Sequence, residues 1–161
     1  MLDVRRAAPA DYAEIAELLN EVIAAGGTTA FTAPVSRDGI ADWVAEGGPR
    51  AAWFVARDDA FALMGFQWIE PHHSLADVAE IATFARRGKT GLGIGSALFE
   101  ATAKAGRDLG YAWINANIRA DNEGGLIYYQ SRGFRAYDRI EGYELGDGTR
   151  VDKILKRYDL D

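Results

Sequence analysis

The sequence contains no cysteine, which excludes disulfides, thiolate metal ligands and a cysteine nucleophile. It also lacks any apolar run near the ~20 residues that a transmembrane helix needs. The first residues, Met-Leu-Asp-Val-Arg-Arg, do not form the apolar core of a signal peptide. A thiol-free chain fits the reducing cytoplasm. We therefore expect a cytoplasmic protein with no membrane partner.

Positive charge is also in short supply. The chain has 18 Lys and Arg against 24 Asp and Glu, a net charge of −6 at pH 7. Binding to nucleic acid requires a clustered basic surface, so nucleic acid is not expected as a partner. The compact basic run is Arg86, Arg87 and Lys89. Three cations suit one small phosphorylated ligand better than a polymer.

What is present is the composition of a globular protein. Hydrophobic residues make up 48% and charged residues 26% of the 161 residues, a balance that supports one core of ordinary size. No repeat, low-complexity stretch or linker interrupts the chain. We predict a single domain over 1–161.

The hydrophobic pattern changes period several times along the chain. Ile15, Leu18, Leu19 and Val22 have the spacing of an amphipathic helix, whereas residues 52–56 resemble a strand. We expect strands at 2–6, 52–56, 61–69, about 75–85, 113–118, 134–140 and 150–158, and helices at about 15–25, 36–46, 93–109 and 122–132. The order β-α-α-β-β-β-α-β-α-β-β predicts an α/β fold with a mixed sheet.

The most informative segment lies between the expected strand at about 75–85 and the expected helix at about 93–109. Gly91, Gly93 and Gly95 alternate there, which lets the backbone approach a ligand closely. The first N–H groups of a helix have no partner within the helix, and with the helix dipole they suit a pyrophosphate. We therefore expect binding of the phosphate groups by the segment Gly91, Leu92, Gly93, Ile94, Gly95 and Ser96.

Other phosphate motifs fit this segment less well. Gly88-Lys89-Thr90 resembles the end of a P-loop, but Thr83 stands where that motif requires its first glycine. A dinucleotide fingerprint would need a third glycine at Ser96 or Leu98. A glycine-rich loop without a ligand is the remaining alternative.

Two motifs in order carry a family resemblance. Residues 90–95 resemble motif A of the GCN5-related N-acetyltransferases, with Thr90 where Arg or Gln is usual. Asn122, Tyr129 and Gly133-Phe134 have the spacing of the second signature of that family. The matching order of elements extends the resemblance over nearly the whole chain. The loop 27–32 and the strand 78–84 are similar to the phosphinothricin and methionine sulfoximine acetyltransferase branch.

The resemblance implies an acyl-CoA N-acyltransferase fold, with acetyl-CoA as co-substrate and no metal. The expected reaction moves an acetyl group to the primary amine of a small molecule, such as methionine sulfoximine or phosphinothricin. It proceeds by direct attack through a tetrahedral intermediate. The family also implies a homodimer. A non-catalytic acyl-CoA-binding module, a protein or peptide N-acetyltransferase and a nucleotide-dependent enzyme are the alternatives.

Several residues receive expected roles. Glu80 aligns with the acidic residue of this branch, and apolar neighbours in its strand would raise its pKa toward that of a useful base. The alternative is a Glu on a solvent-facing strand position. The resemblance assigns pairing with the pantetheine arm to Thr83, Phe84 and Ala85, whose N–H groups would also stabilise the oxyanion.

Tyr129 is the expected acid toward the departing thiolate, with Tyr128 as its competitor, and Asn122 is expected to cap the fourth helix and reach the cofactor arm. His72-His73 would need Asp77 or Glu70 as a further metal ligand, and neighbouring histidines diverge. We therefore expect no metal site there.

Overall fold

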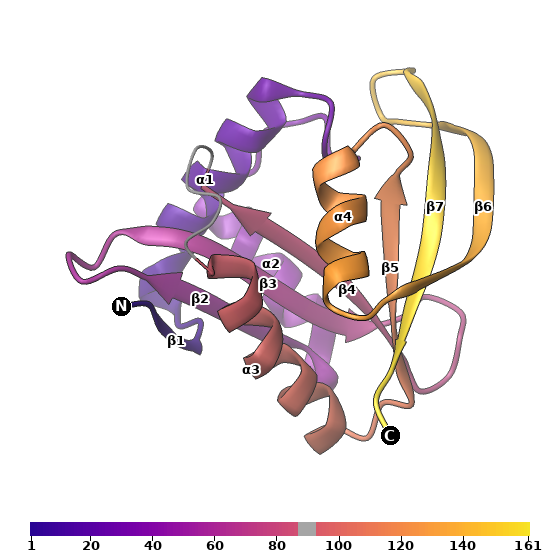
Figure 1. Cartoon of the computed structure of the whole chain (residues 1–161). Coiled ribbons are helices and arrows are strands. Elements are labelled where there is room, and N and C mark those ends of the chain that lie inside the picture. Colours follow the sequence, from indigo (N-terminus) through magenta and orange to yellow (C-terminus); the bar gives the residue numbers. More distant parts are fainter. Residues whose placement is uncertain (87–92) are drawn as a thin grey trace.

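The computed structural model describes residues 1–86 and 93–161. Seven strands form one mixed sheet in the order β1-β2-β3-β4-β5-β7-β6, seen in Figure 1. The strands are β1 (Asp3–Arg6), β2 (Ala52–Arg57), β3 (Leu63–Pro71), β4 (Val78–Ala85), β5 (Trp113–Arg119), β6 (Arg135–Glu144) and β7 (Arg150–Asp159). The helices are α1 (Tyr12–Ala25), α2 (Arg37–Gly47), α3 (Ile94–Asp108) and α4 (Glu123–Ser131). The predicted α/β class and element order are therefore confirmed.

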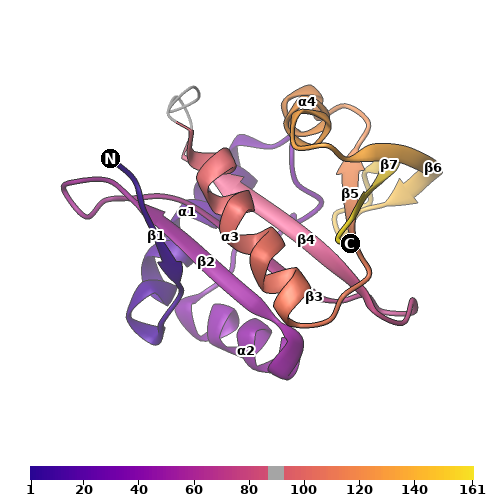
Figure 2. The same cartoon turned by 60° about the horizontal axis from the view of Figure 1, so that its bottom comes forward.

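The helices cover opposite faces of the sheet, as Figure 2 shows. Buried residues of α1 and α2 pack with Phe66, Trp68 and Phe84 on one face. Residues of α3 and α4 pack with Ile69, Ile81 and other sheet residues on the other face. The central strands β2 and β3 are thus covered on both sides, which explains their nearly continuous burial.

Strand β4 contributes to both cores because its side chains alternate between the faces. Glu80, Ala82 and Phe84 lie on the α1 and α2 face, while Ile81 lies against α3 and α4. On one side β4 pairs antiparallel with β3, and on the other it pairs parallel with β5. The pairing with β5 ends at Ile81↔Ala116, although β4 continues to Ala85. The two strands separate beyond that point.

Several boundaries differ from those predicted. Strand β4 begins at Val78 rather than near Leu75, because the preceding Asp77 has a φ of 57° that a strand does not allow. Strand β6 extends to Glu144 beyond the expected 140. It is exposed along nearly its whole length, so no buried face marks its end in the sequence.

The turns follow the predicted local chemistry. Asp58 accepts hydrogen bonds from the backbone N–H groups of Ala60 and Ala62, at 2.9 Å each, between β2 and β3. Gly148, with a φ of 88°, lies in the β6–β7 turn. None of the helices in the described part of the chain is long and apolar enough to cross a membrane.

Candidate active site

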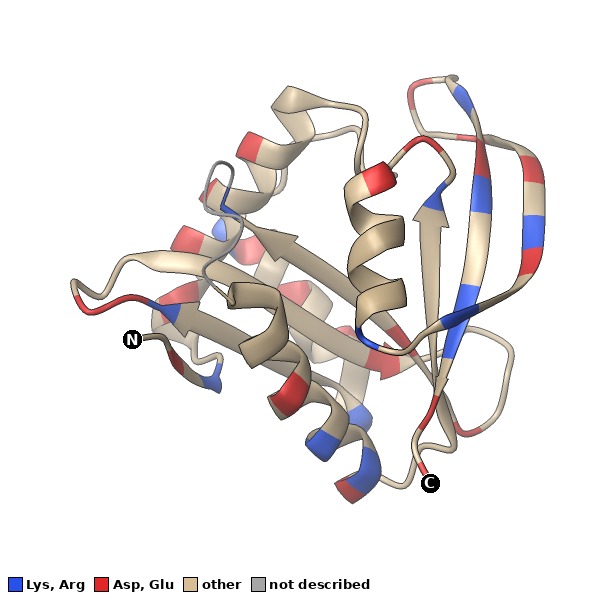
Figure 3. Cartoon of the chain, viewed as in Figure 1, with Lys and Arg blue, Asp and Glu red and all other residues tan. Residues whose placement is uncertain are grey.

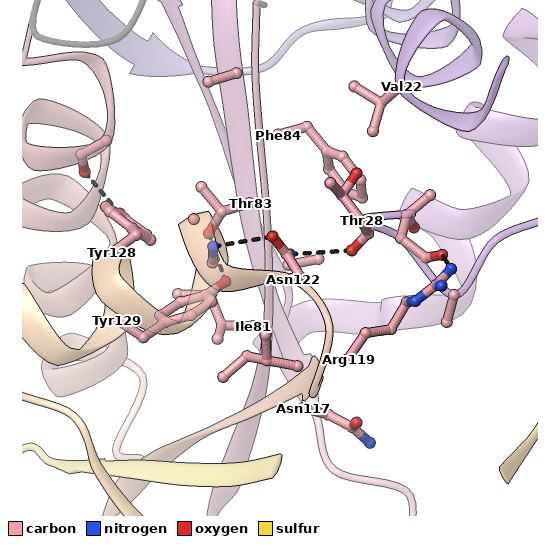
Figure 4. Close-up of a pocket in the computed structure, with 18 of the residues that line it drawn as sticks. Val22, Thr28, Ile81, Thr83, Phe84, Asn117, Arg119, Asn122, Tyr128 and Tyr129 are labelled. Carbon is pink, nitrogen blue, oxygen red and sulfur yellow. Dashed lines mark hydrogen bonds between the residues drawn. The ribbon is translucent and has the colours of Figure 1, made fainter. Parts of the chain in front are cut away.

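A cavity of about 1130 Å³ opens where β4 and β5 separate. Its walls come from β4, β5, the starts of α3 and α4, and the segment that follows α1. Figure 4 shows Thr83, Phe84, Asn117, Arg119 and Asn122 among the residues that line this space. All of the predicted site residues that the structure describes line this cavity, including Glu80 and Tyr129.

The free edge of β4 faces the cavity. Arg86 N donates to Met64 O, and His72 N donates to Val78 O, both on the β3 side. Because backbone groups alternate in direction along a strand, Thr83 and Ala85 turn theirs toward β5. The β5 ladder has already ended there, so these N–H groups point into the gap. The Phe84 N–H faces β3 instead, which narrows the oxyanion hypothesis to Thr83 and Ala85.

The first turn of α3 lies at one end of the cavity. Gly93, Ile94, Gly95 and Ser96 line it, and Gly93 begins the helix with a φ of 75° that favours glycine. Among the described residues no side chain accepts a hydrogen bond from the first N–H groups of α3. These groups are therefore available to an anion. Gly91 and Leu92 lie outside the described residues.

Gly95 also has a role within the protein. A Cβ there would lie 2.5 Å from a ring carbon of Tyr128, so the ring can rest on α3 only because residue 95 is glycine. The Tyr128 hydroxyl donates to Gly95 O at 2.8 Å. The glycine pattern is therefore partly explained by helix–helix packing.

A cation lies beside the helix start. Arg132 donates to the Ser96 hydroxyl at 2.6 Å and lines the cavity. Arg86, considered as a source of charge from the sequence, donates instead to Leu63 O and to the Glu21 carboxylate. The sequence did not predict a role for Arg132 at this site, because Arg132 follows the C-terminal end of α4 and reaches the start of α3 only in the folded chain.

Glu80 is at the other end of the cavity and is half-buried, with 31% of its side chain exposed. Burial raises its pKa to about 7, although a hydrogen bond from Asn115 opposes the shift. Asn115 Nδ2 donates to Glu80 Oε2 at 2.6 Å, and the Tyr137 hydroxyl donates to Asn115 Oδ1. Glu70, which pairs directly with Glu80 across β3 and β4, also raises the pKa.

His72 lies near the same carboxylate. Its Nδ1 accepts hydrogen bonds from the backbone N–H groups of Ser74 and Leu75, at 3.1 Å each. The proton of the neutral ring therefore sits on Nε2, which is 3.9 Å from Glu80 Oε2. Burial lowers the pKa of His72, and the adjacent His73 lowers it further. In the described ranges no group of three or more His, Asp or Glu side chains is placed to hold a metal.

The two tyrosines of α4 differ in what their hydroxyls can do. Tyr128 donates its proton to Gly95 O, and burial raises its pKa to about 12. The Tyr129 hydroxyl lies 2.8 Å from Thr83 Oγ1, which also accepts from Gln67 Nε2 at 2.8 Å. The Thr83 hydroxyl can then donate to Tyr129, leaving the Tyr129 proton for a ligand. Burial raises the pKa of Tyr129, so its hydroxyl is a hydrogen-bond donor.

Asn122 caps α4 as predicted, because its Oδ1 accepts from Gly125 N at 3.0 Å. Its Nδ2 donates to Thr28 O at 3.1 Å, which ties α4 to the segment after α1. Arg119 makes a similar link by donating to Thr29 O at 3.1 Å. The segment 26–31 is thereby held over the cavity.

Comparisons with known proteins agree with this geometry. No protein-family model matches the chain. It is 26% identical over 160 residues to a Bacillus subtilis (strain 168) protein named "Putative phosphinothricin acetyltransferase YwnH", covering 97% of this chain and 98% of that one.

Solved structures share the fold. One is a phosphinothricin acetyltransferase of the GNAT superfamily from Sinorhizobium meliloti in complex with acetyl-CoA. It has a TM-score of 0.86 and 21% identity, covering 99% of this chain and 88% of that one. A ribosomal-protein-alanine N-acetyltransferase from Brucella melitensis has a TM-score of 0.87 at 17% identity, covering 98% and 99%. The chain therefore has the fold of the GCN5-related N-acetyltransferases and, in sequence, resembles their phosphinothricin acetyltransferase branch.

Proposed function

We propose that this chain is an acetyl-CoA-dependent N-acetyltransferase that acetylates the primary amine of a small molecule. One observation carries the proposal. A single cavity has the bare first turn of α3 at one end and the Glu80 carboxyl, with its raised pKa, at the other. The unpaired edge of β4 joins the two ends. This arrangement suits a long ligand with a phosphate head and a reactive tip.

The described residues fit acetyl-CoA as the co-substrate. The N–H groups of Gly95 and Ser96 would hold the pyrophosphate, with Arg132 supplying positive charge. The backbone of Thr83 and Ala85 would pair with the amide-bearing arm as an added strand does. Asn122 lies near the same path. Acetyl-CoA supplies the activated acetyl group.

Glu80 is proposed as the general base. An amine of pKa about 9 to 10 is mostly ammonium at pH 7 and must lose a proton before it can attack. A carboxyl with a pKa of about 7 is half ionised at that pH and can accept the proton. It lies on β4 three residues before Thr83, so an acyl-CoA arm paired with Thr83 and Ala85 would bring its acetyl end toward this carboxyl.

The neighbouring groups stabilise the charges that develop. As the amine nitrogen bonds to the carbonyl carbon, the N–H of Thr83 or Ala85 can donate to the forming oxyanion. When the carbon–sulfur bond breaks, the Tyr129 hydroxyl can hydrogen-bond the departing thiolate. The raised pKa of Tyr129 favours hydrogen bonding over full proton transfer.

The test is a thiol-release assay with acetyl-CoA against a panel of amines. The panel contains phosphinothricin, methionine sulfoximine, methionine sulfone, free amino acids, polyamines, aminoglycosides and short peptides. We expect turnover with one small-molecule class, and a loss of about 10²- to 10⁴-fold in kcat/KM at pH 7 for Glu80→Gln. The matched control is Glu100→Gln on the exposed side of α3, which should leave turnover unchanged.

Two results would contradict the proposal. Binding of CoA without turnover of any amine would favour an acyl-CoA-binding module. Turnover confined to peptides would favour a protein N-acetyltransferase. Family resemblance and composition also lead us to expect a cytoplasmic homodimer, which sedimentation and localisation experiments can test.

A further inference from the structure

Lys153 is a buried cation with no carboxylate beside it. It lies on β7, where Lys and Arg residues recur in Figure 3. The residue is 7% exposed, and within the described ranges no carboxylate oxygen comes within 4.0 Å of its Nζ. Its one close partner there is the ring of Tyr143, whose centroid lies 3.6 Å from Nζ. A buried ammonium ordinarily requires a charged or hydrogen-bonding partner.

Lys153 lines the same cavity as Glu80. Between β5 and β7, Arg119 pairs with Lys153 and Asn115 pairs with Arg157. Between β4 and β5, Glu80 pairs with Asn115. Side chains two residues apart on a strand share a face, so Lys153 is on the face that carries Asn115 and Glu80. Glu80 and Lys153 are close enough to affect each other's pKa but do not form an ion pair.

Among the described residues, the other charged groups at this end of the cavity already have partners. Arg119 pairs with Asp121 at 2.8 Å, and the Glu70 carboxylate accepts from Trp68 Nε1 at 2.7 Å. Glu80 and Lys153 therefore present one acidic and one basic group to the same space. An amine that also carries a carboxylate would match both.

We propose that Lys153 is a specificity-determining residue that binds the carboxylate of an α-amino acid acceptor; this inference rests on the proposed function. The ammonium of the amino acid faces Glu80 and its carboxylate faces Lys153. The Tyr143 ring orients the lysine by a cation–π contact before the substrate arrives. An amine without a carboxylate leaves Lys153 unpaired and is a poorer acceptor.

The experiment compares each amino acid with its own decarboxylated amine. The pairs use methionine sulfone, methionine sulfoximine and phosphinothricin, assayed with the native enzyme, Lys153→Met and Lys153→Arg. We expect the native enzyme to prefer the amino acid. Lys153→Met should lower kcat/KM for the amino acid at least tenfold, mainly by raising KM. The same substitution should change kcat/KM for the decarboxylated amine less than threefold. Lys153→Arg should retain part of the preference.

Calorimetric titration of methionine sulfone into the CoA-bound protein gives a second readout, and Lys153→Met should weaken that binding at least tenfold. Equal losses for both members of a pair would overturn the proposal, because Lys153 would then act through Glu80 or through the fold. A native enzyme that prefers the decarboxylated amine would overturn it as well. If the native enzyme acetylates no amine at all, the proposed function fails first and this inference fails with it.

Discussion

The surroundings of the Glu80 carboxyl, the proposed base, oppose stability at the scale of one residue. Its usual pKa of 4.5 rises to about 7 because burial disfavours the charged form. The protonated carboxyl is therefore favoured in the folded chain relative to the unfolded one. As pH rises from 4.5 to about 7, the unfolded chain loses this proton first, so the contribution of Glu80 to stability falls. Above pH 7 Glu80 is ionised in both the folded and the unfolded chain, so the free-energy cost of burying its charge no longer changes with pH.

Glu80→Gln should remove that penalty. We expect the variant to be more stable than the native chain at pH 8, by roughly 1 to 3 kcal/mol, and about equally stable at pH 4.5. Urea unfolding at the two pH values measures this difference. Equal stability of the two proteins at pH 8 would show that Glu80 is not destabilised by its surroundings.

Single residues of the site differ in how far the sequence reveals them. Glu80 and Tyr129 could be proposed because a local pattern marks each: an acid in an apolar strand and a tyrosine at motif spacing. Lys153 and Asn115 could not, because strand pairing brings Lys153 to the cavity and Asn115 to the Glu80 carboxylate. A single sequence does not specify that register.

At the scale of elements, the contact between α3 and α4 depends on Gly95. A Cβ at this position would lie 2.5 Å from the Tyr128 ring, closer than real contacts allow. We expect Gly95→Ala to destabilise the chain by about 1 to 3 kcal/mol, as overpacking does, and to raise KM for acetyl-CoA. Thermal unfolding and steady-state kinetics measure the two effects.

The matched control is Gly124→Ala in α4. A Cβ there has Asn122 Oδ1 at 3.9 Å as its nearest neighbour, an ordinary contact. Alanine favours a helix over glycine by about 1 kcal/mol, so this change should be neutral or stabilising. If both substitutions have the same effect, the Tyr128 contact does not explain Gly95.

Elements with a buried face are predicted better than elements without one. Helix α3 begins and ends within one residue of its expected range because one stripe of its residues is buried. Strand β6 was predicted too short because it has almost no buried side chains. The separation of β4 from β5 has no local marker, since it depends on where two distant strands stop pairing.

At the scale of the whole molecule, one buried ion cluster joins β1, α1 and β2. Asp11 is 1% exposed and accepts hydrogen bonds from Arg5, Arg57 and the Ala8 N–H. Burial alone would raise the pKa of Asp11, but these hydrogen bonds outweigh it and lower the pKa to about 2. The cluster therefore stabilises the fold above pH 3.8, and this stabilisation is lost as pH falls through about 2.

Asp11→Ala should destabilise the chain by about 1 to 3 kcal/mol at pH 7, because it removes the buried acceptor that Arg5 and Arg57 share and leaves Arg57 with Glu14 as its carboxylate partner. The control is Asp59→Ala, whose partner is the exposed N-terminal amine and whose effect should stay below about 0.5 kcal/mol. Chemical denaturation compares the two. A small effect of Asp11→Ala would mean that the cluster contributes little to holding these elements together.

The most direct test of the central claim is the pH dependence of kcat/KM for the amine, at saturating acetyl-CoA. With an acceptor of pKa about 9, the native enzyme should gain about tenfold per pH unit at low pH and level off near the Glu80 pKa of about 7. Glu80→Gln should be slower and keep rising toward the pKa of the amine. The assignment of Glu80 as the base would be contradicted if the pH profile of the native enzyme had no break near pH 7 and the kcat/KM values of Glu80→Gln lay within twofold of the native values.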